Sequence, residues 1–350
     1  MTRVAINGYG RIGRVAHRVI LEKYLPDIDV VAINAGGSTD IFGWMYLLKY
    51  DSVYGPILSL KIGAEKAEEN PKFKDLIGYL IVEDKKIPVF SQKDPSLLPW
   101  KDLGVDVVIE STGNFTNQEK LTPHLTAGAK AVVLSAPAKD DSVPTFVISL
   151  NDQNYKGEQI ISNASCTTNC IAPVAKMMVD NFGVEKAMMT TIHSYTSDQR
   201  LHDGGHKDYR RARAAGLNMI PTSTGATLAA AKAVPELAGI FDGLSIRVPT
   251  AVGSLADFTF LLKRETTKEE VNEVLKKEAE KPVYKNIVMV TEDPIVSSDI
   301  IGNPYSSIVD LSLTQAMGRM VKIIAWYDNE YGYANRLIEQ VVMVGQKLPA

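Results

Sequence analysis

The 350-residue sequence predicts an α/β protein of two domains, with a parallel sheet flanked by helices followed by an α+β domain containing a mixed or antiparallel sheet. The length suggests two domains, since about 150 residues per domain is usual. Early strand candidates are short, continuous apolar runs separated by helical patterns, which is typical of a parallel sheet buried on both faces. From about residue 184, β-branched runs and an amphipathic helix replace this pattern and favour the second kind of sheet.

The first domain is expected to begin with a strand–helix–strand unit, made by a strand at 4–6, a glycine-rich turn, a helix at about 11–25 and a strand at 30–33. Further buried strands are expected at 105–110, 131–135 and 159–162. Later strands are expected at 188–193, 255–262, 308–313 and 321–326, and helices at 171–179, 226–234, 269–280 and 337–348. Residues 194–217 are polar, basic and long for a loop, which indicates function or an interface.

Charge and composition exclude several classes of protein. The formal net charge is −3, from 38 basic and 41 acidic residues, so no basic excess points to nucleic acid. No apolar run approaches the roughly 18 residues of a membrane span, and the N-terminus enters a strand with no signal-peptide pattern. Two cysteines are too few for a disulfide framework. We therefore expect a cytoplasmic protein with no membrane partner.

A glycine pattern follows the first strand. Gly8 allows a tight turn, Gly10 lets the backbone approach a pyrophosphate, and Gly13 permits close helix packing. The N-terminus of the following helix then faces the anion. Because the pattern follows a strand and opens a helix, we interpret it as a Rossmann dinucleotide-binding turn rather than as a glycine-rich turn without a ligand.

The second strand lacks the acidic residue that would bind the ribose 2′-hydroxyl of NAD, because Ala35 follows its end. Ser38 and Thr39 can donate hydrogen bonds to the extra phosphate of NADP, although Asp40 nearby opposes this. The alternative is that NAD still binds, with one hydrogen bond fewer.

Cys166 lies between a strand and a helical run, near a helix N-terminus. The helix dipole and N–H groups there are expected to favour the thiolate, lower its pKa and bind an oxyanion. Cys170, one turn further on, is interpreted as a buried small apolar residue. Two cysteines four residues apart, with few histidines nearby, do not supply a usual zinc ligand set, so no metal site is expected.

A nucleophilic cysteine needs a base, usually a histidine. His17 and His124 are expected to be solvated, while His202 and His206 lie in the long loop. His193 ends a strand, where the active sites of α/β proteins collect. Its position alone leaves open whether it is the base or a structural histidine.

Five motifs are spread over nearly the whole chain: NGYGRIGR at 7–14, SCTTNC at 165–170, HSYT at 193–196, PTSTGA at 221–226 and WYDNEYGY at 326–333. Together they resemble the glyceraldehyde-3-phosphate dehydrogenase family, in which the cysteine and histidine are also 27 residues apart. The resemblance implies a dinucleotide-binding domain over 1–165, completed by a C-terminal helix at 331–350, and a catalytic domain over 166–330. It also implies a homotetramer, with the loop at 194–217 near the cofactor of a neighbouring subunit.

The resemblance implies the reversible phosphorylating oxidation of glyceraldehyde 3-phosphate to 1,3-bisphosphoglycerate. Cys166 attacks the aldehyde, His193 acts as base, hydride leaves for NAD or NADP, and inorganic phosphate cleaves the thioester. Motif matches place the substrate phosphate at Thr196 and Arg247. The groups implied for the attacking phosphate or the reacting substrate are Ser165, Thr167, Arg211, Thr224 and Gly225. The residues implied for the cofactor are Gly8, Gly10, Arg11, Ile12, Gly13, Ala35, Lys93, Ser111, Thr112, Gly113, Asn329 and Tyr333.

Departures from the family pattern bear on the cofactor. Ala35 stands where NAD-dependent members usually have Asp, Gly204-Gly205 where they usually have Leu-Pro, and Gln92-Lys93 where Glu-Arg is common. All three changes favour NADP or use of both cofactors. Ala251-Val252-Gly253 replaces a common Pro-Asn-Val, which bears on the geometry of the substrate phosphate site.

Two other functions are weighed against the first. Erythrose-4-phosphate dehydrogenase shares the thiol and the base but releases an acid by hydrolysis, so a requirement for inorganic phosphate separates the two enzymes. A nucleotide-binding or nucleic-acid-binding protein without catalysis is the third possibility. Intact Cys166 and His193, together with the negative net charge, argue against it.

Overall fold

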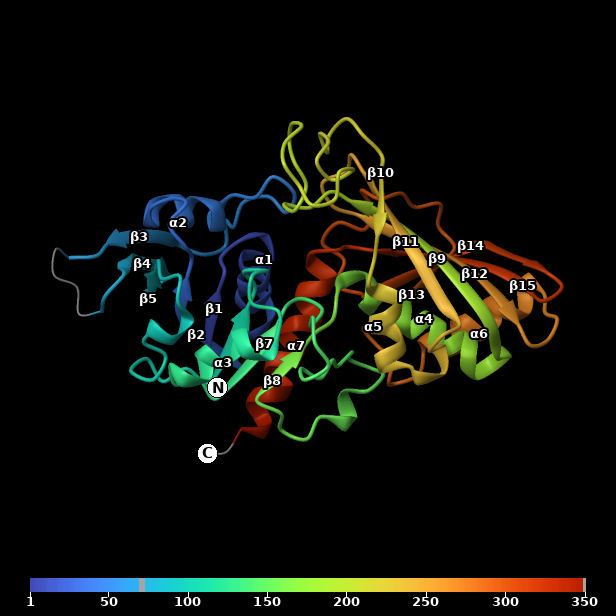
Figure 1. The fold of residues 1–350 in the computed structure, drawn as a ribbon, viewed down its shortest axis with the longest axis horizontal. Coiled ribbons are helices and arrows are strands. Elements are labelled where there is room, and N and C mark those ends of the chain that lie inside the picture. Colours follow the sequence, from blue (N-terminus) through green and yellow to red (C-terminus); the bar gives the residue numbers. More distant parts are fainter. Residues whose placement is uncertain (69–72, 349–350) are drawn as a thin grey trace. The chain divides into compact units, whose positions relative to one another are not determined.

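The computed structural model describes residues 1–68 and 73–348 and divides into two compact units (Figure 1). Unit 1 comprises Met1–Phe146, Tyr155–Ala164 and Ala334–Ala350, and unit 2 comprises Val147–Asn154 and Ser165–Tyr333. The observed division thus falls one residue before the expected boundary at 165, and residues 147–154 belong to unit 2 rather than to the first domain. Residues 69–72 of the first domain and 349–350 of the expected C-terminal segment lie outside the described residues.

Unit 1 contains an eight-stranded sheet in the order β3-β4-β5-β2-β1-β6-β7-β8. Neighbouring strands are parallel from β5 to β8, whereas β3, β4 and β5 pair antiparallel at one edge. The strands are β1 (Thr2–Asn7), β2 (Ile28–Asn34), β3 (Ile62–Lys66), β4 (Leu76–Val82), β5 (Lys85–Phe90), β6 (Val107–Glu110), β7 (Ala131–Leu134) and β8 (Ile160–Ser162). Every residue of β6 and β7 is buried, as expected for central parallel strands.

The strand order of unit 1 reverses at β1, which lies between β2 and β6. The last residues of these three strands, Asn7, Asn34 and Glu110, are direct neighbours in register. Ligands of open α/β sheets bind at the carboxyl ends of the strands at such a reversal. The topology therefore sets the turns that follow β1, β2 and β6 at one potential binding site.

Helices complete unit 1. They are α1 (Arg11–Val19), which continues into a π-helical turn (Ile20–Tyr24), α2 (Ile41–Lys49), a 3₁₀ turn (Pro95–Leu97), α3 (Gln118–Thr126) and the part of α7 (Tyr331–Lys347) from residue 334 onward. Asp40 caps α2 and Asn117 caps α3 by accepting backbone N–H groups, whereas α1 follows Gly10 without a side-chain cap. The first backbone N–H groups of α1 thus receive no side-chain cap, in contrast to those of α2 and α3.

Unit 2 contains a seven-stranded sheet in the order β10-β11-β9-β12-β15-β14-β13. The pairs β9–β11 and β13–β14 are parallel, and the other pairs are antiparallel. The strands are β9 (Val184–Ser194), β10 (Ile220–Ser223), β11 (Phe241–Val248), β12 (Ser254–Leu262), β13 (Val288–Thr291), β14 (Ser307–Met317) and β15 (Met320–Tyr327). A parallel-rich sheet in unit 1 and a mixed sheet in unit 2 confirm the predicted fold class.

The helices of unit 2 lie along one side of its sheet (Figure 1). They are α4 (Cys166–Phe182), α5 (Ala226–Ala233) and α6 (Lys268–Ala279), with 3₁₀ turns at Asp152–Asn154 and Pro235–Leu237. Along β12, buried residues alternate with partly exposed ones, so only one face of the strand is covered. The long helix α4 is mostly buried, which fixes the position of its first residue, Cys166.

Candidate active site

Cys166 is the first residue of α4. Ser165 precedes it as N-cap, and its hydroxyl accepts a hydrogen bond from the Thr168 N–H at 3.0 Å. The Cys166 residue is only partly buried, whereas Cys170 is fully buried and its sulfur lies 3.7 Å from the Ser307 hydroxyl. Cys170 is therefore a buried core residue, as predicted.

His193 lies near the end of β9 with its ring against the thiol. Its Nε2 is 3.4 Å from Cys166 Sγ, and its Nδ1 is 2.7 Å from the backbone carbonyl oxygen of Ser194. A carbonyl only accepts hydrogen bonds, and at 2.7 Å it is nearer to Nδ1 than the other polar neighbour of that atom, the donor Arg247 Nη1 at 3.2 Å. Nδ1 therefore carries the proton and Nε2 presents its lone pair to the sulfur. The structure thus brings the two predicted residues together, with the histidine oriented as a base.

Burial favours the neutral forms of both groups. Burial, and to a smaller extent the charge of Arg247, lower the pKa of His193 to about 3. Burial also raises the pKa of the Cys166 thiol, against the opposing effects of Arg247 and of hydrogen bonds to Thr167. The expectation that the helix N-terminus lowers the thiol pKa is therefore wrong for this site, because desolvation is the larger effect.

Arg247, on β11, lies beside His193 in the register of the two parallel strands. Its Nη1 is 3.2 Å from His193 Nδ1 and donates to the Ser194 carbonyl and the Thr196 hydroxyl, both at 3.3 Å. Its buried Nε has no hydrogen-bond partner within the described part of the chain. A cation with an unused N–H beside a threonine hydroxyl fits a phosphate group, so the two residues implied for the substrate phosphate do lie together.

The N-termini of α4 and α5 meet at Thr168. The Thr168 hydroxyl is 2.8 Å from the Ser165 hydroxyl and donates to the Ala226 carbonyl at 3.3 Å. No side chain caps α5 at Gly225, and the Thr224 hydroxyl accepts the Ala226 N–H at 3.2 Å. These contacts bring Ser165, Thr224 and Gly225 into one region. Helix N-termini attract anions, so the region fits a phosphate group.

Arg211 approaches this region from the long loop. Its Nε donates to the Thr222 hydroxyl at 3.0 Å and its Nη2 donates to the Ser223 carbonyl at 3.4 Å, next to Thr224. Its Nη1 is already paired with Asp198 at 2.6 Å. Each of the three guanidinium nitrogens therefore has a partner within the protein, and these partners fix the position of the side chain.

Tyr327 is a site residue that sequence reasoning missed. Its buried hydroxyl lies 2.9 Å from the Thr167 hydroxyl and 2.8 Å from the Thr191 hydroxyl, and its ring is 5.9 Å from the His193 ring. The signal was available, because Tyr327 stands in the motif at 326–333. The contact fixes Thr167, the residue after the thiol.

Asn329 and Tyr333 are both buried in unit 2. The side-chain oxygen of Asn329 accepts the Ser254 hydroxyl at 2.9 Å and the Gly253 N–H at 3.2 Å. This fixes the amide, and its Nδ2 donates to no partner among the residues that the structure describes. Gly253, in the departing segment 251–253, has φ +96°, and a Cβ there would meet the Ser297 carbonyl oxygen at 2.5 Å. The backbone at this point requires glycine.

The glycines of unit 1 behave as the dinucleotide pattern demands. Gly8 has φ +95°, and a Cβ there would lie 2.5 Å from the Thr112 nitrogen. A Cβ on Gly13 would lie 2.1 Å from the Gly8 carbonyl oxygen, so the helix packs directly on the turn. A Cβ on Gly10 would meet nothing within 4 Å and would project into open space. That is the space a pyrophosphate needs before the uncapped helix, so these residues fit a dinucleotide.

The other residues implied for the cofactor lie around the same strand ends. The Ser111 hydroxyl donates to the Gly8 carbonyl at 2.7 Å, and Thr112 and Gly113 continue that turn. The Arg11 side chain pairs with Asp51, and Ile12 follows it in α1. Ala35 is buried after β2, with its N–H bonded to the Phe90 carbonyl at the end of β5, and Lys93 is exposed three residues beyond that strand.

Two histidines expected to be solvated are instead fully buried in unit 1. The Nδ1 of His17, on α1, lies 2.7 Å from the Tyr9 hydroxyl. His124, on α3, lies between Trp100 and Glu110. Both prediction errors have one cause: each helix turns its histidine toward the interior of the unit. There Tyr9 contacts Nδ1 of His17, and Trp100 and Glu110 satisfy both ring nitrogens of His124.

Among residues 1–68 and 73–348, no cluster of three or more His, Cys, Asp or Glu side chains could hold a metal ion. Within the same residues, no helix combines the length and the apolar character needed to span a membrane.

The glycine-rich turn of unit 1 and the thiol–imidazole pair of unit 2 define the class of dinucleotide-binding oxidoreductases. Residues 2–118 match the family described as glyceraldehyde 3-phosphate dehydrogenase, NAD binding domain, and residues 165–329 match its C-terminal domain. The chain belongs to the glyceraldehyde-3-phosphate dehydrogenase family.

Relatives match the chain from end to end. Proteins named glyceraldehyde-3-phosphate dehydrogenase are 48% identical over 349 residues in Streptomyces coelicolor, 47% over 354 residues in Mycolicibacterium smegmatis and 48% over 351 residues in Mycobacterium tuberculosis. Each alignment covers 99% of this chain and 99% of the relative.

Proposed function

We propose that the protein catalyses the reversible, phosphorylating oxidation of glyceraldehyde 3-phosphate to 1,3-bisphosphoglycerate, with hydride transfer to a nicotinamide dinucleotide. One observation carries the proposal. The His193 Nε2 lone pair faces the Cys166 thiol at 3.4 Å, beside two separate places for an anion. The reaction needs these parts together, because it joins an aldehyde that carries a phosphate to a second phosphate.

In the first step the Cys166 sulfur bonds to the aldehyde carbon and the carbonyl electron pair moves to the oxygen. His193 Nε2 takes the thiol proton and passes it to that oxygen, which gives a hemithioacetal. The neutral imidazole that this requires is present because burial and Arg247 keep the pKa of His193 low. The N-terminus of α4 faces the charge that develops on the oxygen.

In the second step His193 removes the hemithioacetal hydroxyl proton, and the carbon–hydrogen bond breaks with its electron pair leaving as hydride. When bound, the dinucleotide supplies the acceptor for that hydride. The product is a thioester on Cys166. Inorganic phosphate at Ser165, Thr224 and Gly225 then attacks the thioester carbon. The carbon–sulfur bond breaks, and the sulfur recovers its proton from His193.

Each unit, taken by itself, contains residues to which the family resemblance gives a role toward the dinucleotide. In unit 1, Gly8, Gly10 and Gly13 leave room for the pyrophosphate before α1, and the turn at 111–113 follows the adjacent strand β6. In unit 2, the fixed amide of Asn329 has its Nδ2 available to donate to the nicotinamide carboxamide. Both observations support the residue roles carried over from the family.

Initial rates with glyceraldehyde 3-phosphate test this function. We expect turnover that requires inorganic phosphate, is lost in Cys166→Ser with dinucleotide binding retained, and persists in the matched control Cys170→Ser. Turnover of erythrose 4-phosphate without a need for inorganic phosphate would favour the hydrolytic enzyme. Dinucleotide binding without turnover of either sugar would favour the non-catalytic alternative.

We also propose that the protein uses NADP, or both cofactors. The β2–β5 pairing sets Ala35 beside the end of β5, so no carboxylate from β2 opposes a 2′-phosphate there. Lys93 supplies an exposed cation with no hydrogen-bond or ion-pair partner among the described residues. Asp40 is occupied as the N-cap of α2, where its side chain accepts the Gly43 N–H. Comparing kcat/KM for NADP and NAD tests the proposal, and a ratio well below one would contradict it.

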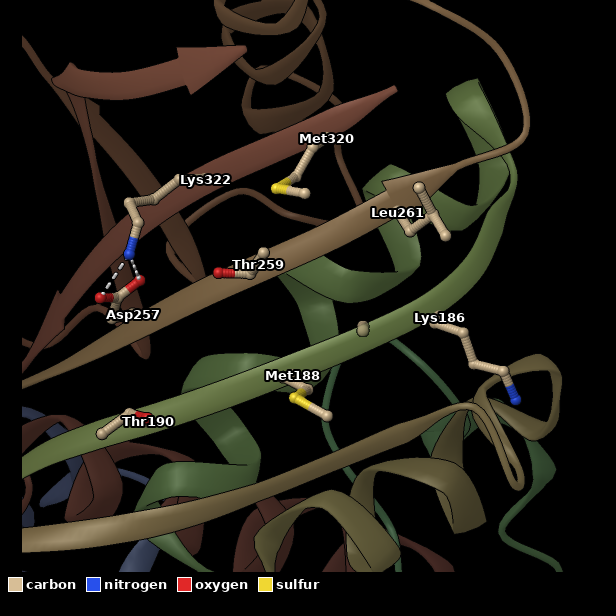
Figure 2. Close-up of a pocket in the computed structure, with 9 residues that line it drawn as sticks. Lys186, Met188, Thr190, Asp257, Thr259, Leu261, Met320 and Lys322 are labelled. Carbon is tan, nitrogen blue, oxygen red and sulfur yellow. Dashed lines mark hydrogen bonds and ion pairs between the residues drawn. The ribbon is translucent and has the colours of Figure 1, made fainter. Parts of the chain in front are cut away.

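A homotetramer that works in the cytoplasm completes the proposal. The strands β9, β12 and β15 present an open face whose shallow hollow holds Met188, Thr259 and Met320 beside the Asp257–Lys322 ion pair (Figure 2). Met188 is 73% exposed and Met320 is 47% exposed. Exposed apolar side chains that gather in one hollow are typical of an interaction surface, here one that a second copy would cover. Light scattering should give a tetramer, and Met188→Lys should give a smaller species. A monomeric wild-type protein would contradict it.

A further inference from the structure

Glu110, the last residue of β6, is fully buried at the carboxyl edge of the unit 1 sheet. Its Oε2 accepts hydrogen bonds from the Asn7 side-chain amide and from His124 Nε2, the latter at 3.0 Å. Its Oε1 accepts the backbone N–H of Thr112 at 2.8 Å and the Thr112 hydroxyl. No lysine or arginine within the described residues pairs with it. Four donors and no cation therefore hold this carboxylate.

The direction of each hydrogen bond in the group is fixed from both ends. On one side the Trp100 indole N–H, which can only donate, gives its hydrogen to His124 Nδ1 at 3.1 Å. The proton of the neutral ring must then lie on Nε2 and point to Glu110.

On the other side the backbone N–H of Gln92 donates to the Asn34 side-chain oxygen at 2.9 Å. The Asn34 amide nitrogen must therefore donate, and it does so to the Asn7 oxygen at 2.7 Å. This leaves the Asn7 amide nitrogen to donate to Glu110. The hydrogen bonds from Asn34 to Asn7, from Asn7 to Glu110 and from His124 to Glu110 thus all run toward the carboxylate, which only accepts. The Asn34 amide nitrogen donates a second hydrogen bond to the Gln92 carbonyl at 2.8 Å.

The group joins the three strand ends that precede the proposed dinucleotide site. Asn7, Asn34 and Glu110 are adjacent in register at the ends of β1, β2 and β6. The turns at 8–10, 35–37 and 111–113 follow them directly. Thr112 ties the last of these turns to the carboxylate through two hydrogen bonds, and Ser111 ties it to Gly8.

We propose that Glu110, with the His124 tautomer set by Trp100, is a positioning residue that aligns these three turns for dinucleotide binding. The inference rests on the proposed function. A glutamine at 110 would turn an N–H pair toward groups that already donate. The glutamine amide could be placed in only two ways. Either Thr112 loses its acceptor, or the side chains of Asn7, Asn34 and His124 all reverse, which the fixed donors of Gln92 and Trp100 oppose.

The test is dinucleotide affinity by calorimetry with NAD and NADP, together with steady-state kinetics. Glu110→Gln should raise the Kd and KM of the dinucleotide at least tenfold, while kcat at saturating dinucleotide stays within about threefold of the wild type. Trp100→Phe, which removes only the indole N–H from the group, should raise the Kd about two- to fivefold. The rate at which iodoacetamide alkylates Cys166 in unit 2 should not change in either variant.

Trp44→Phe is the matched control, because Trp44 is buried in the same unit and its indole N–H has no partner within the described part of the chain. Its Kd should equal that of the wild type. If Glu110→Gln folds and binds the dinucleotide with the wild-type Kd, the inference is overturned. If Glu110→Gln fails to fold, an equal dinucleotide Kd for Trp100→Phe and Trp44→Phe overturns it. Failure of the wild-type protein to bind either dinucleotide would instead contradict the proposed function.

Discussion

His193 in unit 2 and His124 in unit 1 are both buried, and they use their ring nitrogens in opposite ways. His193 donates from Nδ1 to a carbonyl and turns a lone pair toward a thiol, beside the cation Arg247. His124 accepts at Nδ1 from Trp100 and donates from Nε2 to the anion Glu110. Burial alone therefore does not identify a catalytic histidine. The partner of the second nitrogen determines whether the first can act as a base.

Replacing each histidine by glutamine should separate the two roles most strongly. His193→Gln removes the base, so kcat should fall by about 10²–10⁴-fold, the usual contribution of general base catalysis. His124→Gln changes a positioning group, so the KM of the dinucleotide should rise while kcat at saturation stays within about tenfold. Steady-state kinetics with each substrate varied in turn make the measurement. Equal losses of kcat in both variants would break the comparison.

The cation beside His193 provides the next test of the comparison between the two histidines. Arg247→Met removes the cation beside His193 and the donor to Thr196, so kcat/KM for glyceraldehyde 3-phosphate should fall by about 30–150-fold. This corresponds to the roughly 2–3 kcal/mol expected for hydrogen bonds to a charged group. The exposed Arg210, whose side chain has no partner among residues that the structure describes, supplies the control. Arg210→Ala should leave kcat/KM within about twofold, and an equal loss in both variants would indicate a non-specific charge effect.

The two units also differ in the cations they offer to phosphates. Unit 2 supplies Arg247 and Arg211, whereas Lys93 is the cation that follows β5 beside Ala35 in unit 1. Ala35→Asp restores a carboxylate that repels a 2′-phosphate and accepts from a 2′-hydroxyl. The ratio of kcat/KM for NADP to that for NAD should fall about tenfold, a change of about 1.4 kcal/mol. Lys93→Ala should lower the same ratio by a smaller factor, and an unchanged ratio in both would contradict the assignment.

The sequence was sufficient where a local pattern determines the structure. The glycine spacing at 8–13 reflects contacts within one turn, and the positions of Cys166 at a helix start and His193 near a strand end follow from the elements around them. The antiparallel edge formed by β3 and β4 has no counterpart among the elements predicted from the sequence. Such an edge depends on pairing between segments rather than on a pattern within one segment.

The errors share a physical origin in long-range packing. His124 bonds to Trp100 and Glu110, which stand 24 and 14 residues away in the sequence. A polar residue on an apparently exposed helix is therefore buried in the folded unit. The raised pKa of Cys166 likewise follows from its burial in the folded unit. A helix N-terminus can be read from the sequence, whereas the desolvation that outweighs it cannot.

The smallest expected effect is on the pH dependence of the free energy of unfolding. It concerns the buried histidines that have no anionic partner among the described residues. Burial lowers the pKa of both His17 and His193 to about 3, below the ordinary value near 6.5. Between these pH values the unfolded chain binds more protons than the native one, so the free energy of unfolding falls as the pH is lowered from about 6.5 toward 3. Each histidine contributes at most about 1.4 kcal/mol per pH unit.

His17→Gln should therefore reduce the slope of stability against pH by up to that amount below pH 6.5, and should leave the slope unchanged above about pH 7.5. Urea denaturation at half-unit pH intervals makes the measurement. His202→Gln is the matched control for the replacement of a histidine by glutamine, because that histidine lies exposed in the long loop. If His17→Gln and the wild type lose stability at the same rate on acidification, the ring of His17 takes up its proton in the folded protein as readily as in the unfolded chain. The phenol oxygen of Tyr9 would then have to accept a hydrogen bond from an imidazolium.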